Sequence, residues 1–216
     1  MEKINRPALN TISSLVVLND NWEEWGREYE RYLISHKKNE VGFSWRKGIY
    51  TKLRNELNLL AKEHCTFCDG YPFDMSKETI EHYRPKNIFP LEAYDWNNLF
   101  YSCDSCQSYA NKTPFEETLK PDHRNYLFDA FFYVDLEDFK IKVLEILEQS
   151  NKKLFDKSNS FLERYGLNHK NRVARRRNLY RDLKLYFKEE YGEINSRVRD
   201  DFPFRYMYDL VDMLPK

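Results

Sequence analysis

The chain has 216 residues, and its 35 lysines and arginines are balanced by 35 aspartates and glutamates, so the formal net charge is zero. A hydrophobic content of 41%, with 16% aromatic residues, excludes wholesale disorder. No apolar run approaches the roughly 18 residues of a membrane span, and no apolar stretch typical of a secretory signal follows residues 1–7. We therefore expect a cytoplasmic protein without a membrane partner. Because it has only six glycines, we expect a mostly helical chain that forms one unit over residues 1–216.

Two helices are predicted ahead of the first cysteine, over residues 21–35 and 44–63. In the second, apolar residues recur at steps of three and four, which is typical of a helix with one buried face. This apolar stripe comprises Trp45, Ile49, Leu53, Leu57 and Leu60. The stripe runs almost to the first cysteine, so we expect residues 1–63 to form a helical wing that packs on the centre of the fold.

The four cysteines form two C-x-x-C pairs, Cys65 with Cys68 and Cys103 with Cys106, and 34 residues separate the pairs. In a cytoplasmic chain this spacing is typical of a four-cysteine zinc site rather than of two disulfides. Four buried free thiols, or a redox-active pair, are the alternatives. Two pairs at identical spacing with no cysteine left over favour zinc. Such a closed site has no open position for catalysis, so its expected role is structural.

The segment between the cysteine pairs carries Thr-Ile-Glu-His-Tyr-Arg-Pro-Lys at residues 79–86. Its alternation predicts a strand that ends at the proline. Neighbouring strand residues point to opposite faces, so Glu81 and His82 meet in one site only if the chain bends there. A second strand is expected to lead into the second cysteine pair, and a helix is expected over residues 103–112. The predicted order is cysteine pair, strand, loop, strand, cysteine pair and helix.

The remaining residues, 117–216, are expected to form a second, mainly helical wing. The predicted elements, in chain order, are a strand over residues 126–134 and helices over residues 139–149, 152–165, 169–191 and 200–214. Gly166 is expected to cap the helix over residues 152–165, because glycine readily adopts the left-handed conformation that ends helices.

A basic block coincides with the helix predicted over residues 169–191. Residues 166–188 carry eight basic side chains against one acidic side chain. The apolar stripe of this helix includes Val173 and Leu183, and the arginines are predicted to lie mainly off it. A solvated helix face is one interpretation, and contact with nucleic-acid phosphates or with an acidic partner surface is the other. The candidates for phosphate contact are Arg172, Arg175, Arg176 and Arg177.

The motifs between residues 65 and 112 run C-x-x-C, Glu-His-x-x-Pro, Asn-Leu, C-x-x-C, and then an amide and a lysine. This pattern resembles an HNH endonuclease. The resemblance implies a small ββα-metal core, here residues 64–116, pinned by zinc on the four cysteines. It implies that His82 is the general base that activates water and that Glu81 binds a catalytic divalent metal, Mg²⁺ or Mn²⁺. It further implies that Asn98 orients the histidine or its loop.

Two positions depart from the usual HNH pattern. Glu81 replaces the commoner aspartate, and Gln107 stands where asparagine or histidine usually binds the metal. Both side chains keep the oxygen ligands that a hard cation prefers. Asn111 is the alternative second ligand if the helix is shifted. Outside the basic helix, the residues expected to contact nucleic acid are Arg84, Lys86 and Lys112.

A closer resemblance extends over both ends and the middle of the chain. The segments that carry it are residues 1–7, 81–86, 94–99, 111–115, 165–168 and 175–177. Together they resemble the PtuB family of HNH proteins in Septu-type antiphage systems, some of which lie beside retrons. The resemblance implies a defence effector that works with PtuA, an ATPase of the ABC or SMC type. It also raises a retron reverse transcriptase and its RNA–DNA product as candidates for further partners.

The expected fold is therefore α+β and mostly helical, with a zinc-pinned ββα-metal core between two helical wings. The favoured function is a metal-dependent endonuclease acting on DNA or on structured RNA such as tRNA. The alternative is a catalytically silent, zinc-stabilised module that binds nucleic acid or protein. Gln107 favours the alternative, whereas the presence of Glu81, His82 and Asn98 favours the nuclease.

Overall fold

A computed structural model of the chain describes residues 1–35, 43–72, 77–188 and 196–213. Within these ranges the fold is a mixed α+β arrangement, in which two separate two-stranded sheets lie among helices. No helix of the described part is long and apolar enough to cross a membrane. The coarse prediction of an α+β, mostly helical fold is confirmed.

The N-terminal part contains both predicted helices. Its elements are η1 (Leu9–Thr11), η2 (Ser13–Leu15), α1 (Val16–Ser35) and α2 (Tyr50–Ala61). The helix predicted over residues 44–63 begins only at Tyr50, because Lys47 and Gly48 have positive φ angles of 46° and 70°. A helix cannot include this left-handed conformation. Trp45, predicted to be part of the helical stripe, therefore lies outside the helix.

The centre of the fold follows the predicted order of strand, loop, strand and helix. Its elements are β1 (Glu78–His82), η3 (Pro90–Glu92), η4 (Trp96–Asn98), β2 (Leu99–Cys103) and α4 (Asp104–Lys112). The two strands pair in antiparallel register, with Glu81 opposite Phe100 and His82 opposite Leu99. Because α4 follows β2 without a break, the helix begins directly beside the end of the hairpin.

The C-terminal part is helical apart from one small hairpin. Its elements are α5 (Phe128–Phe131), β3 (Phe132–Val134), β4 (Ile141–Val143), α6 (Ile146–Ser150), α7 (Lys152–Arg164), α8 (Lys170–Lys188), α9 (Ser196–Asp200) and α10 (Arg205–Asp212). The prediction for α7 is confirmed, and Gly166 has the expected positive φ, 58°. Residues 189–191 and 214, at the ends of two predicted helices, lie outside the described residues.

Three predictions for this part need correction. The strand predicted over residues 126–134 is present only from Phe132, since α5 precedes it. The helix predicted over residues 139–149 is wrong for β4, where Ile141 and Val143 are buried and pair with β3. The helix predicted over residues 200–214 is divided between the end of α9 and α10.

Two hydrophobic clusters lie on the two sides of the central hairpin. Leu99 and Tyr101 of β2 belong to the cluster that includes Leu53 and Leu57 of α2. Phe100, whose side chain points the other way, belongs to the cluster formed with the C-terminal helices. The hairpin is therefore a wall shared by both cores. The boundaries predicted at residues 63 and 116 stay a prediction.

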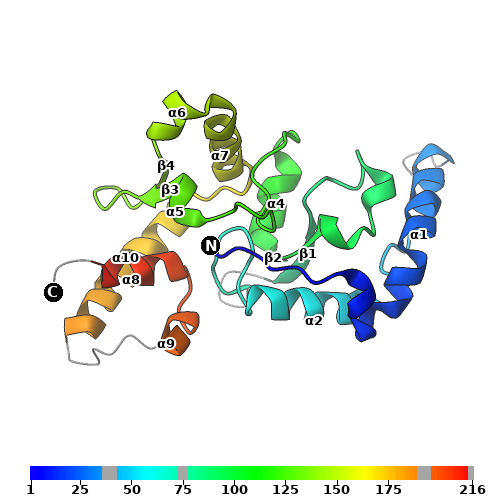
Figure 1. The fold of residues 1–216 in the computed structure, drawn as a ribbon, viewed down its shortest axis with the longest axis horizontal. Helices are drawn as coiled ribbons and strands as arrows, with labels where there is room; N and C mark the ends of the chain where they lie inside the picture. The colour runs from blue at the N-terminus through cyan, green and yellow to red at the C-terminus, as the bar shows by residue number, and fades with distance from the viewer. Residues whose placement is uncertain (36–42, 73–76, 189–195, 214–216) are drawn as a thin grey trace.

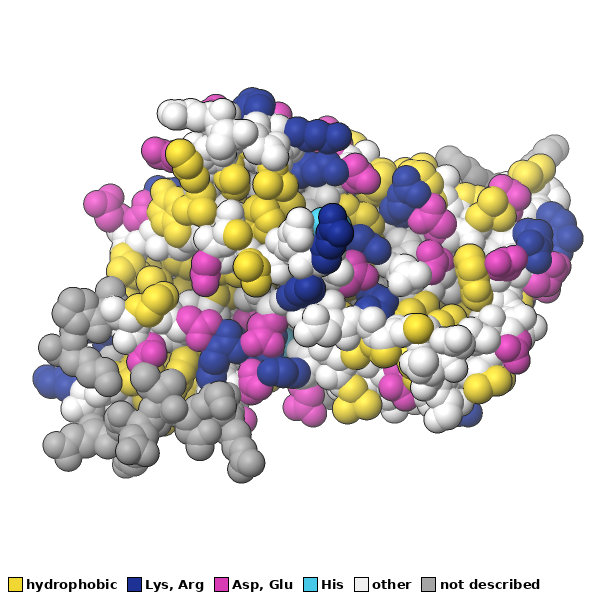
Figure 2. Space-filling model, in the orientation of Figure 1, with side chains coloured by type: hydrophobic (Ala, Val, Ile, Leu, Met, Phe, Trp, Pro, Cys, Tyr) yellow, Lys and Arg dark blue, Asp and Glu magenta, His cyan; other side chains and the backbone are white. Residues whose placement is uncertain are grey.

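The helices of the N-terminal and C-terminal parts lie on opposite sides of the central hairpin. Figure 1 shows α1 at one end of an elongated molecule, α8 and α10 at the other, and β1, β2 and α4 between them. On the face shown in Figure 2, basic side chains are interspersed with acidic ones, in line with their equal numbers in the sequence. The central hairpin and α4 are thus covered from both ends of the chain.

Candidate functional site

The four cysteines form a compact, buried cluster. Their Sγ atoms all lie within 4.8 Å of one another. The Sγ atoms of Cys68 and Cys103 are 3.9 Å apart, close to the separation of about 3.8 Å between two thiolates bound to one tetrahedral zinc. Among the described residues, this is the one group of three or more His, Cys, Asp and Glu side chains that can hold a metal ion. The predicted cluster is confirmed, and its donor set and geometry fit a metal such as zinc.

Each cysteine pair lies on a tight turn of the backbone. In the first pair, the Asp69 amide donates to the Cys65 carbonyl at 2.8 Å, and Asp69 has a left-handed φ of 62°. In the second pair, the Cys103 Sγ accepts from the Cys106 amide at 3.4 Å, at the start of α4. The Thr66 amide donates to the Tyr101 carbonyl at 3.0 Å, which ties the first turn to β2. The hairpin therefore brings the two pairs together.

Arg172 of α8 is a buried neighbour of this cluster. Arg172 is only 3% exposed. Its Nη2 donates to the Sγ of Cys106 at 3.1 Å and lies 3.9 Å from that of Cys103, and its Nη1 donates to the Tyr165 carbonyl. Burial lowers the pKa of Arg172, but the four cysteines outweigh burial and raise the pKa overall. The prediction that Arg172 contacts nucleic acid is wrong, because its guanidinium is buried and donates to the cysteine cluster and to the Tyr165 carbonyl.

Arg176 is also buried, one turn further along α8. It donates to the Phe139 carbonyl at 2.8 Å, to the Leu167 carbonyl at 2.9 Å and to Asn168 Oδ1 at 3.1 Å. These bonds fix the turn before β4, so the predicted phosphate contact is wrong for Arg176 too. Arg175 and Arg177 are exposed. Phosphate contact by these two stays a prediction.

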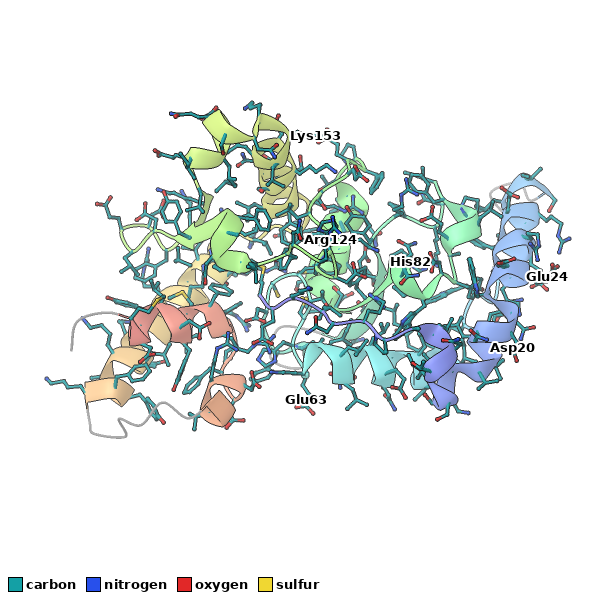
Figure 3. The ribbon with its side chains drawn as sticks, viewed as in Figure 1. Asp20, Glu24, Glu63, His82, Arg124 and Lys153 are labelled. Carbon is teal, nitrogen blue, oxygen red and sulfur yellow. The ribbon has the colours of Figure 1, made fainter. Side chains whose placement is uncertain are left out.

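Glu81 and His82, the last two residues of β1, both line one cleft of about 550 Å³ together with Gln107 and Asn111 of α4. Both are almost completely buried, at 4% and 7% exposure. Figure 3 shows His82 within the body of the protein, away from the edge that α1 forms. The strand ends at this point, and the loop that follows completes the cleft with Pro85, Lys86 and Asn87. The structure therefore brings five of the sequence-predicted site residues together, namely Glu81, His82, Lys86, Gln107 and Asn111.

The orientation of His82 is fixed by one hydrogen bond. Its Nε2 lies 3.0 Å from the Ala93 carbonyl oxygen. A carbonyl oxygen only accepts, so Nε2 carries the proton and the neutral ring presents Nδ1 as a free lone pair. Burial, and then the nearby Lys86 ammonium, lower the pKa of His82 to about 3, so the ring is neutral at neutral pH. The histidine is thus held in the protonation state that a base requires.

Glu81 is a buried carboxyl group with two amide side chains in its cleft. Burial raises the pKa of Glu81 to about 8, although Arg164 and the hydrogen bond from Gln107 oppose that rise. The Gln107 Nε2 also donates to the Ile80 carbonyl at 2.8 Å, which holds the amide against β1. With this pKa the Glu81 carboxyl is mostly protonated at neutral pH, so a bound cation would have to displace its proton. The carboxylate so formed and the two amides would supply oxygen donors that fit Mg²⁺ or Mn²⁺, ions that keep several waters and share ligands with a substrate phosphate.

Asn98 supports the loop rather than the histidine ring. Its Oδ1 accepts from the Arg84 amide at 2.7 Å, and its Nδ2 donates to the carbonyls of Arg84 and Glu92 at 2.9 and 3.0 Å. Glu92 directly precedes Ala93, whose carbonyl orients His82. Asn98 is therefore connected to the histidine through the loop backbone.

The three basic residues predicted to bind nucleic acid lie in different places. Lys86 lines the cleft, with its Nζ 4.3 Å from the centre of the Trp45 ring. Arg84 pairs with Glu92 at 2.5 Å and lies over the Phe89 ring, outside the cleft lining. Lys112 is exposed at the end of α4, in a neighbouring hollow that Asn111 also lines. Only Lys86 is therefore placed beside Glu81 and His82.

Sequence reasoning missed one wall of the cleft. Trp45, Arg46 and Tyr50 all line it. The sequence predicts Trp45 to be a core residue of a longer helix, and it predicts no site role for Arg46 or Tyr50. Gly48, in the middle of the segment, is the signal that a turn rather than a helix precedes Tyr50.

A scan against protein-family models finds no match, and a search of curated proteins finds no matching relative. The function therefore has to be argued from the cleft and from the cysteine cluster.

Proposed function

We propose that this protein is a metal-dependent endonuclease that hydrolyses phosphodiester bonds in nucleic acid. The observation that carries the proposal is the single cleft in which the β1 residues Glu81 and His82 meet the α4 amides Gln107 and Asn111. A positioned base, a carboxylate and neutral oxygen donors are the groups that metal-assisted hydrolysis of a phosphodiester requires.

In the proposed reaction, His82 Nδ1 takes the proton from the water that attacks phosphorus. The Ala93 carbonyl keeps the ring aligned and stabilises the imidazolium that forms, because it accepts from Nε2 in both protonation states. Glu81, Gln107 and Asn111 are the candidate ligands of Mg²⁺ or Mn²⁺, which when bound would offset the negative charge of the phosphate and of the leaving oxygen. Lys86, which also lines the cleft and lies near His82, is the candidate contact for the same phosphate.

We propose zinc for the cysteine cluster, in a structural role. Four thiolates close the coordination shell, so the ion has no position for substrate. A zinc ion with four thiolates carries a net charge of about −2. Arg172 offsets part of this charge inside the protein. The zinc would hold the start of α4, and with it Gln107, against the turn at residues 65–68.

The biological setting rests on the resemblance alone. We propose that the protein is the toxic effector of an antiphage system and that it acts with a PtuA-type ATPase. A retron reverse transcriptase and its RNA–DNA product are proposed as further partners. DNA and structured RNA such as tRNA both contain the bond that the cleft would hydrolyse, so both belong in the first assay.

The test is incubation of the purified, zinc-loaded protein with Mg²⁺ and either plasmid DNA or total cellular RNA. We expect strand breaks with the wild type and none with His82→Ala, while a Lys153→Ala control, on the exposed side of α7, keeps cutting. If the wild type does not cut alone, the assay is repeated with the ATPase. Binding of nucleic acid without breaks in both formats would reject the nuclease and favour the silent binding module.

A further inference from the structure

The segment between α1 and α2 adds an aromatic wall to the proposed active site. The Trp45 ring meets the His82 ring edge-on, with 5.5 Å between the ring centres, and Tyr50 stands perpendicular to Trp45 at 5.6 Å. Both aromatic residues line the cleft, and neither is fully buried. Large aromatic side chains are therefore available to a ligand directly beside the proposed base.

Both rings pack on one side against the hydrophobic cluster that includes Leu53 and Leu57, and they also line the cleft. The other side chains that line the cleft are mostly polar or charged. A cation lies over each ring: Lys86 Nζ is 4.3 Å from the centre of Trp45, and the Arg46 guanidinium is 4.7 Å from that of Tyr50. Aromatic faces alternating with cations suit a nucleic-acid strand, whose bases stack on the rings while its phosphates meet the cations.

We propose that Trp45 and Tyr50 stack on an unpaired base next to the scissile phosphate, so that the cleft selects single-stranded or looped nucleic acid over duplex. This inference rests on the proposed function and names its substrate class. In a duplex, each base is stacked on both faces and paired at its edge, so it reaches an aromatic wall only after unstacking. An unpaired base reaches the same wall without that cost. Stacking does not read the sugar, so the preference applies to DNA and RNA alike.

Binding measurements separate stacking from simple charge attraction. The probes are a short fluorescent single-stranded oligonucleotide, as DNA and as RNA, and the duplex of the same sequence. Affinity is measured by anisotropy on the zinc-loaded protein without added divalent metal, so that cleavage does not occur. The variants are Trp45→Ala, Trp45→Phe and Tyr50→Leu, with Tyr133→Ala, a surface aromatic residue on β3, as control. Zinc content and melting temperature show whether each variant is folded.

We expect Trp45→Ala to weaken single-strand binding about 5- to 150-fold, the range of one lost base–aromatic stack, and to change duplex binding less than about threefold. Trp45→Phe keeps most of the affinity, Tyr50→Leu loses part of it although its volume is largely kept, and Tyr133→Ala changes nothing. Equal losses on both probes, or no loss in folded Trp45→Ala and Tyr50→Leu, overturn the inference. If the wild type cuts nucleic acid and these variants keep its preference for single strands, the stacking inference is wrong and the nuclease proposal is still supported. If the wild type neither binds nor cuts nucleic acid, alone or with the ATPase, both proposals fail.

Discussion

Replacement of Arg172 by methionine tests the role that the structure gives this residue. The substitution keeps the apolar stem of the side chain and removes the guanidinium. It leaves Cys106 Sγ and the Tyr165 carbonyl without their donor in a region where Arg172 is 3% exposed. Removal of one partner from a buried charged pair costs about 3–5 kcal/mol, because the other charge stays buried. For a chain of 216 residues, each kcal/mol lowers the melting temperature by about 2–4 °C, so the expected decrease is about 6–20 °C.

The assay is thermal unfolding of the zinc-loaded protein, together with the rate of zinc release to a chelator. Lys170→Met, two residues earlier at the exposed start of α8, is the control and should change stability by less than about 0.5 kcal/mol. Arg172→Lys should fall between the two, since lysine keeps the charge but not the two-pronged geometry. A melting temperature for Arg172→Met within about 2 °C of the wild type, with unchanged zinc release, would refute this account of the buried arginine.

Three further predictions concern the metal, the loop and the packing of α1. Zinc removal by a chelator, or Cys106→Ser, should unfold the centre of the protein, and circular dichroism with zinc analysis measures it; a metal-free protein with an unchanged melting curve would contradict it. Asn98→Asp should lower the cleavage rate at least about tenfold, because a carboxylate replaces the amide that donates to Arg84 and Glu92 carbonyls; wild-type kinetics would contradict the link to His82. Gly26→Ala places a Cβ 2.5 Å from the Leu91 carbonyl oxygen and should cost about 1–3 kcal/mol of stability by overpacking, whereas unchanged unfolding in urea would show that the loop yields.

The parts of the fold set by local sequence were predictable. The helix over residues 152–165 and its glycine cap follow from periodicity and from the left-handed conformation of Gly166, which the structure contains. The cysteine cluster follows from spacing, because two C-x-x-C turns leave few ways to arrange four thiolates. The order of β1, β2 and α4 could also be predicted from the sequence, because each element has its own residue pattern.

The parts set by distant partners were not predictable. Arg172 and Arg176 were predicted to be surface charges, because arginine on a helix usually faces solvent. In the structure both are buried, because cysteine sulfurs and backbone carbonyls from distant parts of the chain accept their hydrogen bonds. Residues 141–143 read as helix, but pairing with β3 makes them a strand. Trp45 fitted an apolar stripe, and only the left-handed turn at Lys47 and Gly48 moves it to the cleft.

The most direct test of the central claim is the single-turnover cleavage rate of His82→Ala against the wild type, at equal zinc content and saturating Mg²⁺. The substrate is whichever nucleic acid the wild type cuts, with the ATPase present if cutting requires it. Loss of a positioned general base should slow cleavage about 10²- to 10⁴-fold. Substrate binding should stay unchanged, because Lys86 and the candidate metal ligands are untouched. A His82→Ala rate within about twofold of the wild type, far above that expected after loss of the base, would contradict the proposed active site.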